Sequence, residues 1–196
     1  IYRENDIPTP PSLMLEKADI ALIKKKLGKK IVIKPNADGS SVGVTVNPPQ
    51  SKWKKFIETR IKKEGSCLIE AFRQGRELTV GVLGDEALPV IEIIPKKAFF
   101  DFEAKYTPGM SDEICPAPIP QNIMRTAQNL ALKAHQALGC RGYSRTDMIW
   151  SSKGVEILET NTLPGMTETS LLPLAAKTAG LSFPKLLDQM IRLAMK

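Results

Sequence analysis

Histidine and cysteine are scarce in this sequence, and their scarcity excludes several kinds of active site. The 196 residues contain one histidine, His135, and three cysteines, Cys67, Cys115 and Cys140. His135 falls on a predicted amphipathic helix and is interpreted as structural, so no Ser-His-Asp or Cys-His arrangement can be built around it. The cysteines lie too far apart for a zinc motif, and their odd number argues against a disulfide framework. We therefore expect buried free thiols in a reducing cytoplasm.

Long apolar runs and common nucleotide signatures are missing as well. No apolar run approaches the length of a membrane span, and the first residues have no signal-peptide pattern. Neither the Walker pattern nor the dinucleotide glycine fingerprint occurs. A nucleotide site must therefore use another architecture. The first residue is Ile1 rather than methionine, which predicts a fragment whose N-terminal part is missing.

The composition that remains is ordinary for a soluble globular protein. Hydrophobic residues make up 42% and charged residues 25%, and 196 residues can bury a core as one domain or two small ones. The net charge of +7 is compatible with nucleic-acid binding. However, the basic residues concentrate in predicted helices ("IKKKLGKK", "KWKKFIETRIKKEG"), where a solvated face is the commoner explanation. Small polyanions such as nucleotides suit the charge equally well.

The spacing of apolar residues predicts interleaved strands and helices without internal repeats. Helices are expected from the capping residue Asp19 to Gly28, from Trp53 to Gly65, from Met124 to Gly139, and twice at the end of the chain. The proline-rich segment 107–121 is expected to lack regular structure. Strands are expected at 30–35, 66–72, 76–84, 87–95, 98–106, 142–150 and 154–161. This order favours an α+β fold built around antiparallel hairpins.

Lys34 ends a short apolar strand just before the glycine-serine loop "NADGSSVG" at 36–43. Glycines let backbone N–H groups approach an anion closely, and hydroxyl groups add donors. A lysine beside such a loop would neutralise phosphate charge. The alternative is a lysine that extends into water from a strand end beside a flexible surface loop.

Two glutamates, Glu70 and Glu77, stand seven residues apart in "IEAFRQGREL". Their carboxylates could hold a ribose or an adenine amino group, while Phe72 lines an apolar slot. A solvated pair on an edge strand explains them equally well.

The last two predicted strands carry the strongest signal. By strand alternation Arg145 and Asp147 point one way, and Glu159 and Asn161 share a face. A four-residue turn makes the strands antiparallel neighbours and sets residue 147 opposite position 158 or 159. Two close carboxylates repel unless a cation intervenes, and oxygen ligands without His or Cys indicate Mg²⁺. The alternative is a structural network in which Arg145 neutralises both carboxylates.

Lys105 and Tyr106 stand where "FEAKY" meets the proline-rich connection. A lysine and a phenol at the root of a mobile loop suggest a lid over a phosphorylated intermediate. Taken alone, they also fit a lysine and an aromatic residue on a surface strand.

Taken in order, these segments resemble the D-alanine–D-alanine ligases of the ATP-grasp superfamily. The matching stretches span nearly the whole chain: "VIKPNADGSSVGV", "CLIEAF", "GRELTVGVLGDEALPVIEI", "DFEAKY", "ICPAPI", "LGCRGYSRTDMI" and "EILETNTLPGMTETSLLP". The resemblance implies an ATP-grasp fold of class α+β, with two α+β subdomains whose antiparallel sheets sandwich the nucleotide. It implies a central subdomain at 1–77 and a C-terminal subdomain with the metal and acceptor sites at 78–196. The family's N-terminal domain would be absent.

The same resemblance assigns nucleotide and metal contacts by position. Two Mg²⁺ ions, or Mn²⁺ in their place, would be held by Asp147, Glu159 and Asn161. The nucleotide would be bound by Lys34 at the phosphates, Lys105 at the γ-phosphate, Glu70, Ala71 and Arg73 at the adenine edge, Glu77 at the ribose, and Val44, Phe72, Phe99 and Leu158 as pocket walls.

The acceptor side would be built from other residues. Arg145 and the Gly165 N–H would stabilise the tetrahedral oxyanion, and Ser170 and Leu171 would hold the carboxylate of the second substrate. Tyr106 and Ser40 would join a hydrogen-bonded set whose third member, a glutamate, belongs to the absent domain.

The implied reaction joins two D-alanines in two steps, for peptidoglycan synthesis in a bacterial cytoplasm. The carboxylate of one D-alanine attacks the γ-phosphate of ATP to give an acyl phosphate, and the amine of the second displaces phosphate. The implied partners are D-alanine, ATP and the protein's own N-terminal domain. A homodimer is left open, and neither nucleic acid nor membrane is expected. The fragment alone is expected to be inactive or to bind nucleotide weakly.

Three other functions stay open. Another ATP-grasp carboxylate–amine ligase would share the ATP site, although "TLPGMTETSLLP" and Tyr106 fit a dipeptide site better. A nucleotide-binding module without catalysis is less consistent with intact Arg145, Asp147 and Glu159. A basic nucleic-acid-binding domain lacks any recognised motif.

Overall fold

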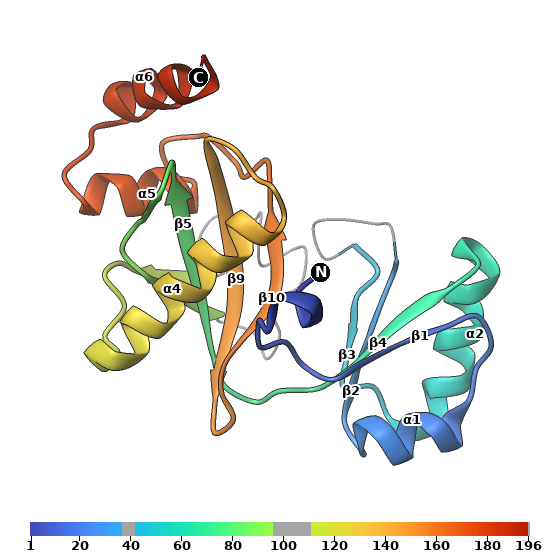
Figure 1. Cartoon of the computed structure of the whole chain (residues 1–196). Coiled ribbons are helices and arrows are strands. Elements are labelled where there is room, and N and C mark those ends of the chain that lie inside the picture. The colour runs from blue at the N-terminus through green and yellow to red at the C-terminus, as the bar shows by residue number, and fades with distance from the viewer. Residues whose placement is uncertain (37–41, 96–110, 196) are drawn as a thin grey trace. The chain divides into compact units, whose positions relative to one another are not determined.

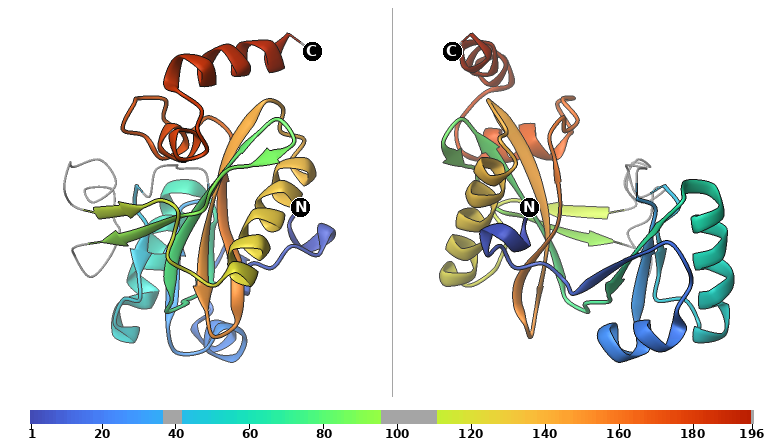
Figure 2. Two further views of the ribbon diagram at one scale, coloured as in Figure 1. Left: turned by 90° about the vertical axis from the view of Figure 1, so that its left-hand side faces the viewer. Right: turned by 45° about the vertical axis from the view of Figure 1, so that its right-hand side comes forward.

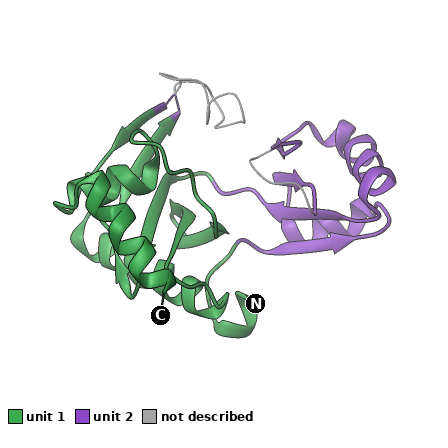
Figure 3. Ribbon diagram, turned by 90° about the horizontal axis from the view of Figure 1, so that it is seen from above, with its two compact units in different colours: residues 1–9, 74–94, 112–196 green, residues 10–73, 95–111 purple. Residues whose placement is uncertain are grey.

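The computed structural model describes residues 1–36, 42–95 and 111–195 (Figure 1). Contacts within the chain group them into two units (Figure 3). The larger unit comprises residues 1–9, 74–94 and 112–195, and the smaller unit comprises 10–36 and 42–73 with Pro95 and Ser111. The subdomain boundary between residues 77 and 78 stays a prediction.

In chain order the elements are η1 (Arg3–Asn5), β1 (Ser12–Leu15), α1 (Ile20–Leu27), β2 (Ile31–Lys34), β3 (Thr45–Val46), η2 (Gln50–Lys52), α2 (Trp53–Glu64), β4 (Cys67–Ala71), β5 (Arg76–Leu83), β6 (Glu86–Ala87), β7 (Ile91–Pro95), β8 (Ser111–Ile114), α4 (Gln121–Ala137), β9 (Tyr143–Ser151), β10 (Gly154–Asn161), α5 (Leu171–Thr178) and α6 (Phe183–Ala194).

The smaller unit is an antiparallel sheet in the order β1-β4-β2-β3, with α1 and α2 packed against one face (Figure 1). Helix α1 begins as expected after Asp19, whose Oδ1 accepts a hydrogen bond from the Leu22 N–H at 2.8 Å, and it ends at Gly28 with φ of 88°. Strand alternation sends every second residue of the sheet toward the helices. The core consists of the buried residues Ile23, Ile31, Ile33, Trp53, Ile57, Cys67 and Ile69.

The three cysteines are free thiols, as expected, but only Cys67 is buried, and Cys115 and Cys140 are partly exposed. Cys67 is buried in the smaller unit, and this burial raises the pKa of its thiol to about 11. The group therefore stays protonated and unreactive at neutral pH, because the thiolate is the reactive form.

The larger unit is built on a second antiparallel sheet in the order β10-β9-β5-β7-β8, with β6 paired to β5 (Figure 2). Alternate residues of β5, β9 and β10, including Val80, Met148 and Ile157, face α4 and form the core with its alanines. On the other face, Gly81 makes room for α5, because a Cβ there would lie 2.9 Å from Leu172 Cδ1. Helix α4 and helix α5 thus cover opposite faces of the sheet.

Two expectations for the chain between β5 and α4 need correction. The strand expected at 87–95 is split into β6 and β7, because Pro89 cannot donate a ladder hydrogen bond. The segment 107–121, expected to lack regular structure, contains strand β8 at Ser111–Ile114 on the edge of the larger sheet. Residues 111–114 contain no proline, so the prolines elsewhere in 107–121 do not prevent a strand there. Across the described residues no helix is long and apolar enough to cross a membrane.

His135 is expected to make the stability of the larger unit depend on pH. Burial lowers the pKa of the imidazole, an effect that Asp85 partly opposes, and its Nδ1 lies 2.7 Å from Ser144 Oγ. A pKa lower in the folded than in the unfolded state means that the unfolded chain binds the proton first. The contribution of His135 to the free energy of unfolding should therefore be fully present above pH 6.5, the ordinary pKa of a histidine. It should be lost as the pH decreases below that value. Urea unfolding at several pH values between 7.5 and 5.5 measures this.

The control for this prediction is His135→Gln, which removes the only histidine of the chain. Its unfolding free energy should change less over the same pH interval. An equal pH dependence in both proteins would show that other groups cause it.

Candidate functional site

The candidate site lies on the face of the larger sheet that α4 does not cover (Figure 1). On this face three strands align polar residues in two rows. Asp147 of β9 pairs with Thr79 of β5 on one side and with Glu159 of β10 on the other. One step along, Arg145 pairs with Gly81 and with Asn161. Directly opposed residues of antiparallel strands point to the same face. The four side chains grouped from the sequence therefore share one face.

A β-bulge at Leu158 makes this arrangement possible. The register pairs Ile157 with Met148 and then Glu159 with Asp147, so Leu158 has no partner. In a regular ladder Leu158 would oppose Asp147, and Glu159 would point toward α4, because side chains alternate between faces. The extra residue turns Glu159 and Asn161 toward the site. Of the two positions left open by the sequence, the structure selects 159.

Arg145 and Asp147 form a two-point ion pair. Arg145 Nε donates to Asp147 Oδ1 and Nη2 donates to Oδ2, each at 3.0 Å. The Thr79 hydroxyl donates to the same Oδ1 at 2.7 Å. The side chains of Arg145 and Asp147 are only 13% and 14% exposed, so solvent screens this pair less than a surface pair. The Arg145–Asp147 part of the network that was the alternative to a metal site is thus present in the protein.

Asn161 and Glu159 are the β10 members of the two rows. Asn161 Oδ1 accepts a hydrogen bond from the Leu163 N–H at 3.0 Å, an Asx turn that fixes the carboxamide oxygen just after the strand. Glu159 is exposed to solvent. On the opposite face Thr160 Oγ1 lies 3.0 Å from Thr146 Oγ1 and accepts a hydrogen bond from the Tyr2 hydroxyl at 2.7 Å. These bonds fix the β9–β10 register at the site.

The donor set fits a hard divalent cation. Two carboxylates and an amide oxygen meet on one face, and Mg²⁺ prefers a few such oxygens together with phosphate oxygens. Within residues 1–36, 42–95 and 111–195, no group of three or more His, Cys, Asp or Glu side chains is placed to hold a metal alone. A cation here would therefore need Asn161 beside the two carboxylates, with water or substrate oxygens completing its coordination.

The loop between β10 and α5 brings two predicted acceptor residues together. Ser170 is the N-cap of α5, and a Cβ on Gly165 would lie 3.0 Å from Ser170 Oγ. That Oγ does not cap the helix; it accepts from the Thr167 N–H at 3.1 Å and lies 2.8 Å from Thr167 Oγ1. Leu171 is the first residue of α5. Thr167, which orders this loop, was not singled out from the sequence.

In the smaller unit, Lys34 and Glu70 are partners rather than separate features. Lys34 Nζ lies 2.6 Å from Glu70 Oε2, with the two side chains 20% and 8% exposed. Both point away from the core, because Ile33 and Ile69, their neighbours in β2 and β4, are core residues. This burial argues against a lysine that simply extends into water. Sequence reasoning assigned each residue a role without seeing that they pair.

The other predicted nucleotide residues that the structure describes are divided between the two units. The Ala71 N–H donates to Pro11 O at 2.8 Å, so a base contact by Ala71 would use its carbonyl oxygen. Val44, Phe72 and Arg73 are partly buried next to β3 and β4. Glu77, in β5 of the larger unit, is opposite Ile93 and Ile149 and shares the face of the two rows. Four predicted residues lie outside the described part of the chain: Ser40, Phe99, Lys105 and Tyr106.

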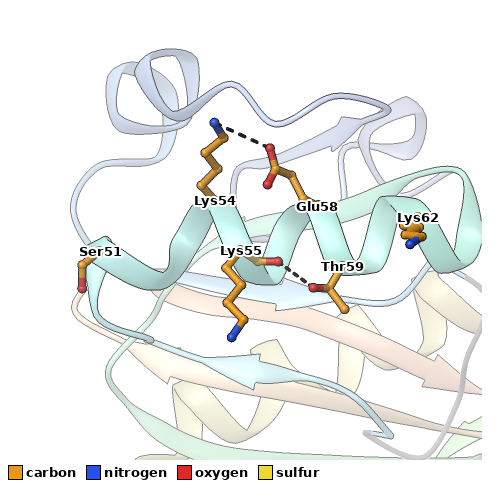
Figure 4. Close-up of a pocket in the computed structure, with 6 residues that line it drawn as sticks. All are labelled: Ser51, Lys54, Lys55, Glu58, Thr59 and Lys62. Atoms are coloured by element: carbon orange, nitrogen blue, oxygen red, sulfur yellow. Dashed lines mark hydrogen bonds and ion pairs between the residues drawn. The ribbon is translucent and has the colours of Figure 1, made fainter.

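A surface hollow on α2 contains none of these residues (Figure 4). Its lining comes from one exposed side of the helix, where Lys54 Nζ lies 3.8 Å from Glu58 Oε1. The hollow is charged and open, and it fits a solvated helix surface better than a ligand site. The residues that line it are Ser51, Lys54, Lys55, Glu58, Thr59 and Lys62.

Comparison with known proteins adds sequence and fold relationships. A family model described as "D-ala D-ala ligase C-terminus" matches residues 1–192. A D-alanine–D-alanine ligase of Syntrophobacter fumaroxidans is 48% identical over 204 residues, covering all of this chain and 66% of its own length. One from Desulfotalea psychrophila is 49% identical over 177 residues, covering 87% of this chain and 55% of its own length. The chain therefore spans less than two thirds of the length of these relatives.

Solved structures show the same relationship. A D-alanine–D-alanine ligase from Bacillus anthracis complexed with ATP has a TM-score of 0.84 at 29% identity, over 99% of this chain and 62% of that chain. The VanG D-Ala:D-Ser ligase from Enterococcus faecalis has a TM-score of 0.81 at 32% identity, over 97% of this chain and 58% of that chain. The expected α+β ATP-grasp fold with antiparallel sheets is confirmed.

Proposed function

Because the chain belongs to the D-alanine–D-alanine ligase C-terminal family, we propose that it forms the ATP-grasp part of an enzyme that joins two D-alanines at the expense of ATP. The product, D-alanyl-D-alanine, would serve peptidoglycan synthesis in a bacterial cytoplasm. The observation that carries the proposal is the alignment of Arg145, Asp147, Glu159 and Asn161 on one sheet face by the Leu158 bulge. The alignment sets the Glu159 carboxylate directly opposite that of Asp147, and two like charges on one face favour a bound cation.

Asp147, Glu159 and Asn161 are proposed to hold the divalent cation of the ATP complex. More specifically, we propose that the site holds two Mg²⁺ ions, for which Mn²⁺ can substitute. When bound, the metal would neutralise phosphate charge and polarise the transferred phosphoryl group. Asn161 contributes an oxygen whose direction is already fixed by the Leu163 N–H.

Nucleotide binding is proposed for residues of both units. In the smaller unit, Lys34 would neutralise the phosphates, and its buried partner Glu70 would orient it. In the larger unit, Glu77 would hold the ribose. The remaining proposed contacts, by the part of the nucleotide they meet, are Ala71 and Arg73 at the adenine edge, Val44, Phe72, Phe99 and Leu158 at the ring faces, and Lys105 at the γ-phosphate.

The chemistry proposed for this chain is positioning and charge stabilisation. The carboxylate of the first D-alanine attacks the γ-phosphate, and the resulting acyl phosphate accepts the amine of the second D-alanine. Arg145 and the Gly165 N–H would stabilise the oxyanion that forms in the second step. Ser170 and Leu171 would hold the second substrate's carboxylate, and Ser40 and Tyr106 would belong to the same acceptor site. A further N-terminal domain is a proposed partner, and a homodimer is compatible with the proposal.

A second candidate differs only in the acceptor. The likeness to a D-Ala:D-Ser ligase, at 32% identity and a TM-score of 0.81, favours D-serine as the alternative second substrate. ATP and metal binding would be unchanged, because the two candidates differ only in the acceptor pocket.

The deciding experiment is an ADP and phosphate release assay on the full-length protein with Mg·ATP. We expect release that depends on D-alanine, with D-lactate and D-serine replacing it poorly as second substrates. The isolated chain of 196 residues is expected to be inactive or to bind nucleotide weakly. Release that no D-amino acid stimulates would contradict the proposal and favour a nucleotide-binding module.

A further inference from the structure

We propose that Thr79 is a positioning residue of the metal site, which holds the Asp147 carboxylate in the orientation that binds the cation. The proposal rests on the function proposed above. Thr79 was not singled out from the sequence, where a threonine in "RELTVGVL" fits an ordinary strand residue. In the structure it is the third member of the row formed by Asp147 and Glu159.

The Thr79 hydroxyl has one proton and two acceptors within reach. Its Oγ1 lies 2.7 Å from Asp147 Oδ1 and 3.3 Å from the Thr146 carbonyl oxygen. The shorter contact leads to a charged oxygen, and hydrogen bonds to ionised groups are shorter and stronger than neutral ones. The proton is therefore assigned to Asp147. Because Thr79 is 0% exposed, no water can replace this donor if the hydroxyl is removed.

Three hydrogen bonds then fix the plane of the carboxylate. Arg145 supplies one donor to each oxygen, and Thr79 adds a second donor to Oδ1. A carboxylate oxygen offers about two lone-pair directions. The two donors at Oδ1 and the one at Oδ2 together set the direction of the carboxylate.

Arg145 would serve two groups in the proposed function. Its Nε and Nη2 bond Asp147, and the same guanidinium would donate to the oxyanion. Thr79 comes from a buried position in β5 and makes no contact with substrate in this scheme. Partners that orient a metal ligand in this way typically change metal affinity by about 10- to 100-fold when lost.

The test uses three variants of the full-length protein. Thr79→Val keeps the shape and removes the hydroxyl, and Thr79→Ser keeps the hydroxyl. The matched control is Thr146→Val, because Thr146 is also 0% exposed and bonds through Oγ1 to Thr160 on the opposite face. The probe is Mn²⁺, whose free concentration is followed by electron paramagnetic resonance in the absence of nucleotide. The Mg²⁺ concentration for half-maximal activity is measured beside kcat.

We expect Thr79→Val to raise the Kd for Mn²⁺ and the half-maximal Mg²⁺ concentration by about tenfold. For Thr79→Ser, both values should stay within about threefold of those of the parent protein, a smaller change than that expected for Thr79→Val. Thr146→Val should lower thermal stability without changing the Mn²⁺ affinity. Equal Mn²⁺ affinities in Thr79→Val and Thr146→Val would overturn the positioning role.

Asp147→Asn separates this failure from failure of the proposed function. If Asp147→Asn weakens Mn²⁺ binding and Thr79→Val does not, the positioning role alone is wrong. If Asp147→Asn leaves Mn²⁺ binding unchanged, the metal site itself is wrong, and the role of Thr79 is wrong with it.

Discussion

Replacing Glu159 by glutamine is expected to lower the ligase turnover of the full-length protein by about a thousandfold. The physical reason is the loss of one negative oxygen ligand, since charge stabilisation by a metal contributes several kcal/mol and each 1.4 kcal/mol changes a rate about tenfold. The fold should hardly respond, because Glu159 is exposed and surface substitutions usually change stability by within about 0.5 kcal/mol. Turnover and thermal unfolding are measured on the same preparation.

The matched control for Glu159→Gln is Glu86→Gln, another exposed glutamate of the larger sheet, in strand β6. It should change neither turnover nor stability. If the Glu159 variant lost thermal stability in parallel with activity, the carboxylate would be part of the structural network and the metal role would be untenable.

Arg145→Gln is expected to produce two separate effects. Turnover should fall by about 100- to 1000-fold, the usual cost of losing an oxyanion donor. In metal-free buffer the fold should also lose about 1–3 kcal/mol, because the largely buried Asp147 carboxylate loses the two hydrogen bonds from Arg145. For a chain of this size that corresponds to a fall in Tm of roughly 2–4 °C per kcal/mol. Differential scanning calorimetry measures the second effect.

Added Mg²⁺ should restore part of the lost Tm in the Arg145 variant. A cation between Asp147 and Glu159 would replace the missing guanidinium, since the two carboxylates are directly opposed. Arg141→Gln is the control, because Arg141 is exposed just before β9. An identical Mg²⁺ response in the parent and in the Arg145 variant would contradict the shared role of arginine and metal.

The hairpin of β9 and β10 shows how far periodicity can predict a site. Alternation placed Arg145 with Asp147, and Glu159 with Asn161, and the short turn made the strands neighbours. It could not choose between positions 158 and 159, because nothing in "VEILETN" marks a bulge. A bulge depends on the ladder of two strands together, and that information is not local.

Two side-chain pairings also could not be predicted from the sequence. Thr79 is 67 residues from the carbonyl and 68 from the carboxylate that it meets, so only the tertiary fold brings them together. Lys34 and Glu70 bond across neighbouring strands whose register the sequence does not set. The α1 cap was predicted correctly because Asp19 and Leu22 are local neighbours.

The Leu158 bulge also has a consequence for engineering. A stability-driven redesign that idealised the larger sheet would keep all residues of β10, pair Leu158 regularly with Asp147 and so remove the bulge. The resulting strand would satisfy every rule of regular pairing, yet the carboxylate of residue 159 and the amide of residue 161 would be rotated into the helix-covered interior. A screen for thermal stability could favour such a variant unless the cost of its buried polar groups were taken into account. Insertions and deletions within β10 should therefore be assessed by the sheet face to which each following side chain then points, and not only by the length or hydrophobicity of the strand.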